Sequence, residues 1–169
     1  MFFEEHAKLL ADFARVSQAA GARADYVQGG GGNTSVKLPG GLMAIKASGF
    51  CLSDIHPDQA YAVLDGADLR NFYLTTEPSE LADVEKEGSA RAKADVRHID
   101  GLADLRPSVE AGFHSILKTF VVHTHSVYAN LAACSTACRP IAAQAFAGAN
   151  YTWGWVPYTD PGANLTFAI

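Results

Sequence analysis

The sequence lacks the long apolar run of a membrane-spanning helix, since no stretch approaches the roughly 20 residues needed to cross a bilayer. Its first residues, Met1 to Glu5, have no basic segment and include two glutamates, which argues against a secretory signal. Cysteine is scarce: Cys51, Cys134 and Cys138 are odd in number and too few for a disulfide scaffold. These absences predict a protein of the reducing cytoplasm, with no membrane partner.

Positive charge is also in short supply. The chain has 13 lysines and arginines against 18 acidic residues, a formal net charge of −5. A nucleic-acid binder is excluded because no basic surplus exists to neutralise a phosphate backbone. A single small phosphate remains possible, since a few backbone N–H groups suffice to bind it. The length of 169 residues, 49% of them apolar, predicts one globular domain over residues 1–169.

Apolar spacing predicts an amphipathic helix over residues 4–20, with Gly21 as its C-cap. A hairpin follows, in which residues 33–38 and 42–47 are strands on either side of the Pro-Gly-Gly turn. Further along, the pattern predicts a short strand over 61–64, a helix over 79–100 interrupted at Gly88 and Ser89, a helix over 107–117, a buried strand over 120–125, a helix over 126–138 ended by Pro140, and a β-prone stretch over 151–158. This alternation favours an α/β fold whose sheet is not purely parallel.

The predicted strand at 120–125 carries two histidines, His123 and His125. Side chains two residues apart on a strand point the same way, so both imidazoles can bind one cation at about 2.0–2.1 Å per zinc–nitrogen bond. Two hydrogen-bonded core histidines are the alternative interpretation. Cys134 and Cys138 offer a structural zinc site with these histidines, although their alanine-rich surroundings favour packing as small apolar residues.

Glu110 lies near the start of the helix that leads into the histidine strand. There it can serve as a third ligand or as a general base, or it can simply favour the helix dipole. His114 follows four residues later on the same helical face. It can orient the Glu110 carboxylate through a hydrogen bond, with a buried packing histidine as the alternative.

The glycine run Gly29–Gly32 precedes a strand rather than a helix, which argues against a P-loop and against a dinucleotide fingerprint. Glycines let the backbone approach an anion closely, although a flexible loop is the alternative. If the hairpin forms, Ser48 and Gly49 lie beside the run, and the two turns together predict a phosphate site. Lys37 and Lys46 can add charge there, but exposed strand lysines are the default interpretation.

Four ordered motifs, spread over about residues 26 to 162, resemble the class II aldolase/adducin family: Gly32-Asn33-Thr34-Ser35, Lys46-Ala47-Ser48-Gly49, Pro107-Ser108-Val109-Glu110 and His123-Thr124-His125. Their wording is most similar to the aldolase part of bifunctional rhamnulose-1-phosphate aldolase/alcohol dehydrogenase proteins. The resemblance implies a three-layer α/β/α sandwich around a mixed, largely antiparallel central sheet. It also implies a homo-oligomer, usually a tetramer.

The resemblance also assigns roles to residues. It makes Glu110 the catalytic acid/base, and His123 and His125 two of the three histidines that hold a divalent cation, usually Zn²⁺. The substrate phosphate would be held by Gly32, Asn33, Ser48, Gly49 and Ser108. Two departures stand out: Val109 replaces a frequent second serine, and no histidine follows His125 to act as the third ligand. We therefore expect the C-terminal part of the domain to be missing.

The activity implied by the resemblance is that of a metal-dependent lyase, which cleaves a small ketose phosphate through a metal-stabilised ene-diolate. Epimerisation or dehydration of a sugar phosphate would use the same parts. A non-catalytic binding module of the adducin type is the alternative from another class, favoured by the missing third ligand and disfavoured by the presence of Glu110 and both histidines.

Overall fold

The computed structural model describes all residues, 1–169. In chain order, its α-helices and strands are α1 (Phe2–Gly21), β1 (Asn33–Lys37), β2 (Leu42–Lys46), β3 (Tyr61–Asp65), α2 (Gly66–Thr75), α3 (Val84–Ala94), β4 (Val96–Arg97), α4 (Ala111–Ile116), β5 (Phe120–His123), α5 (Val127–Ala133), α6 (Cys138–Ala145) and α7 (Ala163–Ala168). None of the helices combines the length and the apolar character needed to cross a membrane.

The five strands form one sheet in the order β4-β3-β2-β1-β5, and every neighbouring pair is antiparallel. The predicted hairpin is confirmed, because β1 and β2 pair with Val36 opposite Ala44. The other edge of β1 pairs with β5, which places Asn33 opposite His123. The predicted antiparallel character is therefore confirmed, and no parallel pair accompanies it.

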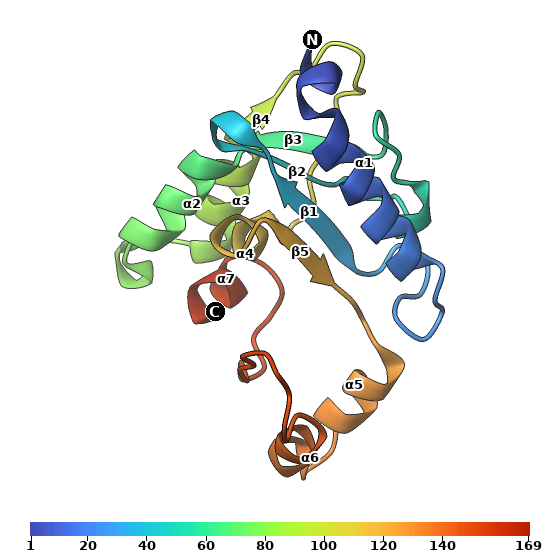
Figure 1. Cartoon of the computed structure of the whole chain (residues 1–169). Helices are drawn as coiled ribbons and strands as arrows, with labels where there is room; N and C mark the ends of the chain where they lie inside the picture. The colour runs from blue at the N-terminus through green and yellow to red at the C-terminus, as the bar shows by residue number, and fades with distance from the viewer.

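Helices cover both faces of the sheet, which confirms the three-layer α/β/α arrangement (Figure 1). On one face, Leu10 and Phe13 of α1 pack in a core with Val36 and Tyr61 of the sheet. On the other face, α2, α3, α4 and α7 enclose a second core built around Ile45 of β2. Each fully buried large apolar side chain contributes about 1.5–3 kcal/mol to folding.

Several helix bounds differ from those expected. Helix α1 includes Gly21, with Ala22 as its C-cap, and α2 follows β3 without having been predicted. Helix α3 runs through Gly88 without interruption, because this buried glycine fits against Tyr73 and Ala163. The predicted helix at 107–117 begins only at Ala111, since Pro107 forms an isolated bridge with Ala47 in the sheet.

Residues 124–161, which we call the outer segment, lie below the sheet and away from both helical layers (Figure 1). The predicted helix at 126–138 is two helices here, α5 and α6, and Pro140 stands in the first turn of α6, where a missing N–H costs nothing. The stretch 151–158 forms no strand. No residue of the outer segment is buried, and we call the rest of the chain the body.

Candidate active site

Glu110 lies at the centre of the candidate site, at the N-cap of α4, with 8% of its surface exposed. Its carboxylate makes no capping bond to its own helix. Instead, Oε2 accepts a hydrogen bond from Asn33 Nδ2 and lies 3.1 Å from His123 Nδ1. The pairing of β1 with β5 brings these two partners together, so the structure places a carboxylate, an amide and an imidazole in one contact.

His125 lies just past the end of β5 rather than within the strand, so the predicted strand was two residues too long. The two imidazoles are nonetheless neighbours, with ring centroids 4.9 Å apart. The glycine loop packs against them: a Cβ at Gly31 would stand 3.0 Å from His125 Nδ1, and one at Gly32 would stand 2.7 Å from the His123 carbonyl oxygen. Gly32 also has a φ of +70°, which disfavours any other residue.

The turn after β2 is held beside the segment that leads to Glu110. Ser48 N donates to the Arg106 carbonyl oxygen over 2.9 Å, and Arg106 Nη2 donates to Ser48 Oγ over 3.2 Å. Ser108 Oγ accepts a hydrogen bond from the Glu110 N–H over 3.3 Å. The five residues predicted to bind phosphate therefore lie on three adjoining stretches of chain, namely Gly32 and Asn33, Ser48 and Gly49, and Ser108.

Lys46 ties two of these stretches together, and its role was missed in the sequence. Its Nζ donates to the carbonyl oxygens of Gly30, over 3.1 Å, and Phe50, over 2.7 Å. Only 3% of the residue is exposed, so the expectation of an exposed lysine was wrong, and burial lowers its pKa. Strand alternation carried the signal, because Lys46 shares the face of β2 with Leu42 and Ala44, which α1 covers.

The whole arrangement matches a known family. The model of the class II aldolase and adducin N-terminal domain covers residues 11–168 of the chain. The chain belongs to this family.

Solved structures share its fold. The N-terminal class II aldolase domain of a conserved protein from Thermoplasma acidophilum aligns with a TM-score of 0.73 at 21% identity, over 92% of this chain and 70% of that one. YgbL from Klebsiella pneumoniae, a putative aldolase/epimerase/decarboxylase, aligns with a TM-score of 0.52 at 18% identity, over 78% of this chain and 50% of that one. Identities this low show the fold alone, and no curated protein matches.

In this class II aldolase/adducin domain, His114 does not orient the Glu110 carboxylate, contrary to the sequence-based expectation. Its Nδ1 is 2.8 Å from Ser35 Oγ, its ring stacks on Phe113, and its Nε2 has no partner. The side chain is completely buried, and this burial lowers the pKa of His114 to about 3. The packing alternative describes it better, and Asn33 takes the orienting position at the carboxylate.

The neighbouring rings of His123 and His125 are the two side chains that could hold a divalent cation here. When its proton is on Nδ1, His123 donates to Glu110 and leaves Nε2 free as a ligand, as is usual for metal-binding histidines. No group of three or more His, Cys, Asp or Glu side chains is arranged to hold a metal. Cys134 and Cys138 are free thiols at the end of α5 and the start of α6, so the structure forms no two-His, two-Cys site.

Proposed function

We propose that this chain carries the acid/base and two metal ligands of an aldolase-type lyase, which acts on a small phosphorylated hydroxy-carbonyl compound. The observation that carries the proposal is the contact of the Glu110 carboxylate with both Asn33 and His123 beside the glycine loop. A nearly buried carboxylate in a fixed direction can transfer a proton. The adjoining glycine-rich and Ser48-Gly49 turns suit a phosphate group.

The chemistry follows from these positions. Retro-aldol cleavage of a ketose 1-phosphate breaks the C3–C4 bond: the C4 hydroxyl gives its proton to the Glu110 carboxylate as C4 becomes an aldehyde, and the bonding electrons pass to the C3–C2–O unit. Glu110 then gives a proton to C3, which yields dihydroxyacetone phosphate, and it removes that proton in the reverse direction. A divalent cation, Zn²⁺ by family resemblance, held by His123 and His125 would polarise the C2 carbonyl.

Asn33 and Lys46 support this proton transfer without taking part in it. The Asn33 amide occupies one lone pair of Glu110 Oε2, which fixes the direction of the carboxylate. Lys46 holds the glycine loop against the turn that contains Ser48 and Gly49. The two stretches proposed to bind phosphate thus keep a fixed spacing when no substrate is present, so less ordering is needed on binding.

Hydrogen exchange at C3 of dihydroxyacetone phosphate tests the proposal without knowledge of the partner aldehyde. In D₂O with added Zn²⁺, the wild-type protein is expected to replace one C3 hydrogen by deuterium, followed by proton NMR. Glu110→Gln should slow this exchange by about 10²–10⁴-fold, the usual contribution of an acid/base group. Its unfolding temperature should stay close to that of the wild type, because the glutamine oxygen can still accept from Asn33.

Glu5→Gln is the matched control, because Glu5 is an exposed glutamate on α1, and it should exchange at the wild-type rate. Equal rates for wild type and Glu110→Gln would refute the acid/base assignment. No exchange by the wild-type protein would refute the lyase proposal and favour a non-catalytic module. Epimerase and decarboxylase activities, named in the description of YgbL, are further candidates to assay with the same two variants.

Homo-oligomeric assembly, which the family resemblance implies, belongs to the same proposal. The outer segment exposes many large apolar side chains that the body does not cover, including Tyr128 at 70%, Leu131 at 72% and Trp153 at 41% exposure. Large exposed apolar patches are typical of surfaces that meet another chain. This exposure supports assembly, and the number of subunits stays a prediction.

A further inference from the structure

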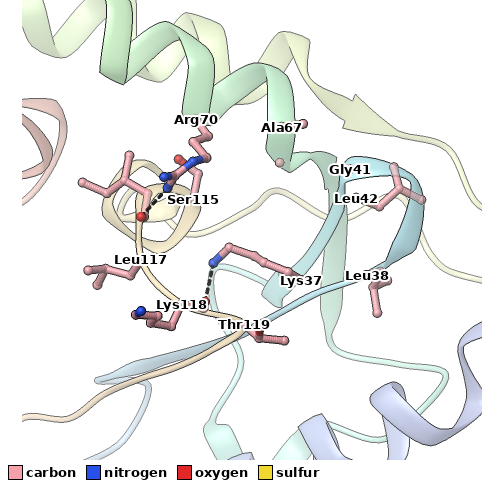
Figure 2. A pocket seen from close by; sticks show the side chains of 12 residues that line it. Lys37, Leu38, Gly41, Leu42, Ala67, Arg70, Ser115, Leu117, Lys118 and Thr119 are labelled. Carbon is pink, nitrogen blue, oxygen red and sulfur yellow. Dashed lines mark hydrogen bonds between the residues drawn. The ribbon is translucent and has the colours of Figure 1, made fainter. Parts of the chain in front are cut away.

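A pocket of about 510 Å³ lies around the C-terminal end of β1 (Figure 2). Glu110 contacts Asn33 at the opposite end of this strand. Asn33 begins the strand and Lys37 ends it, so the two sites are separated by about 13 Å at roughly 3.3 Å per residue. Its walls come from the end of β1, the following turn, the start of α2 and the loop between α4 and β5. Pockets of this size hold small metabolites.

Three cationic side chains and no acidic one line this pocket: Lys37, Arg70 and Lys118. The chain as a whole carries a net charge of −5, so this is a local reversal of sign. Four of the ten other cationic side chains, those of Arg15, Arg23, Arg91 and Arg97, each form an ion pair with an aspartate. None of the three pocket cations has a carboxylate partner in the structure.

Two of the three cations donate hydrogen bonds to backbone carbonyl oxygens at the C-terminal end of α4 and in the loop that follows it. Lys37 Nζ donates to the carbonyl oxygen of Lys118, and Arg70 Nη1 donates to that of Ile116 (Figure 2). Lys37 Nζ also donates to the carbonyl oxygen of His114. These bonds leave one N–H of Lys37, four of Arg70 and all three of Lys118 available. Burial, and to a smaller extent the neighbouring charge of Arg70, lower the pKa of Lys37 to about 8. Helix capping accounts for two of the cations and leaves Lys118 unexplained.

The remaining wall suits the rest of a small organic anion. Gly66 and Ala67, the first two residues of α2, line the pocket, and the N–H groups of a first helical turn have no partner within the helix. Leu38, Leu42 and Leu117 add an apolar surface. A guanidinium group with two ammonium groups matches the geometry and charge of a phosphate better than those of a singly charged carboxylate.

We propose that this pocket is a second ligand site, distinct from the Glu110 site, which binds the phosphate group of a small phosphate ester between Lys37, Arg70 and Lys118. The phosphate oxygens accept from the free N–H groups of the three cations, and the organic part lies against the leucines. This site does not depend on the proposed lyase activity.

Amide chemical shifts of the ¹⁵N-labelled whole chain, titrated with inorganic phosphate, test the proposal. The amides of Ala67, Ile116 and Thr119 are expected to shift and saturate together. Sodium chloride and sodium acetate at matched ionic strength should produce no saturable change there. The amides of Gly32 and Ser48 report on the Glu110 site in the same spectra, so failure of one site is distinguished from failure of the other.

Lys118→Glu is the decisive variant, because this exposed side chain makes no hydrogen bond and its loss should leave the fold intact. Phosphate affinity at the pocket should fall by about tenfold or more, as expected when one cation is replaced by an anion beside a phosphate. Lys8→Glu is the matched control, since Lys8 is an exposed lysine on α1. The phosphate affinity of this variant at the pocket should stay near that of the wild type. Equal losses in both variants, equal saturation by acetate, or no saturation by phosphate would each overturn the proposal.

Discussion

The body and the outer segment carry similar helical patterns, yet they bury their apolar residues very differently. In the body, Phe13 of α1 is 1% exposed, because a sheet face lies opposite the helix. In the outer segment, Leu131 of α5 is 72% exposed, and neither α5 nor α6 has a buried residue. Apolar spacing therefore predicts a helix in both regions, but burial depends on a second layer that only the body provides.

The candidate site lies on the border between these two regions. Glu110, Asn33 and Ser48 belong to the body, where the sheet and α4 hold them. His123 ends the strand at the border, and His125 already belongs to the outer segment. The packed body therefore fixes the position of Glu110. The position of His125 depends on the outer segment, in which no residue is buried, and on contact with the glycine loop at Gly31.

The largest effect should come from removing a core side chain in the body. Phe13→Ala is expected to lower the free energy of unfolding by about 3–5 kcal/mol, because it leaves a cavity between α1 and the sheet. Leu131→Ala in the outer segment should change it by less than about 0.5 kcal/mol in the monomeric chain, as for other surface substitutions. Urea denaturation of both variants checks the difference. Similar losses in the two would show that the outer segment is packed in solution.

Two glycine substitutions compare the packing of the body with that of the outer segment, because each adds a methyl group. A Cβ at Gly112 of α4 would stand 2.4 Å from Thr166 Oγ1 and 2.8 Å from Tyr73, so Gly112→Ala should cost about 1–3 kcal/mol. A Cβ at Gly154 of the outer segment would meet nothing within 4 Å. Gly154→Ala should therefore be neutral in thermal unfolding. A neutral Gly112→Ala would contradict the close packing of α4 on α2 and α7.

A pH response confined to the body makes the third comparison. Burial lowers the pKa of His114 to about 3 from an ordinary value of 6.5, so the folded state keeps the ring neutral where the unfolded chain protonates it. The resulting stability is fully present above pH 6.5 and is lost as the pH falls from 6.5 toward 3. Urea denaturation between pH 7 and pH 4 should show a shallower decline for His114→Gln than for the wild type. His56→Gln, at an exposed histidine, should keep the wild-type slope.

Local patterns in the sequence were enough to predict α1 and the β1–β2 hairpin, whereas the largely antiparallel sheet was implied by the family resemblance. Alternation also predicted that Ser48 and Gly49 lie near the glycine run, because an antiparallel hairpin brings the end of β2 beside the start of β1. Helix α2 was not predicted because its first turn, Gly66 to Asp68, consists of poor helix formers apart from Ala67. The side chain of Asp65 caps this turn by accepting a hydrogen bond from the Asp68 N–H.

Long-range contacts within the site were beyond the reach of local patterns. The bond between Glu110 and Asn33 joins residues 77 positions apart, and it depends on the pairing of β5 with β1. His114 was assigned to the carboxylate from helical spacing, but its ring bonds to Ser35 on the sheet instead. Alternation places Lys46 on the same face of β2 as Ala44, but its burial also requires that α1 covers this face.

The central claim is that His123 and His125 can bind one cation together while Glu110 accepts a hydrogen bond from His123 Nδ1. Imidazole ¹⁵N spectra of the labelled chain, recorded during a Zn²⁺ titration, test it most directly. We expect His123 to carry its proton on Nδ1, and His123 Nε2 and one His125 nitrogen to shift together at one equivalent of Zn²⁺. If the exposed rings of His56 and His98 respond first, or if only one ring of the pair responds, the account is contradicted.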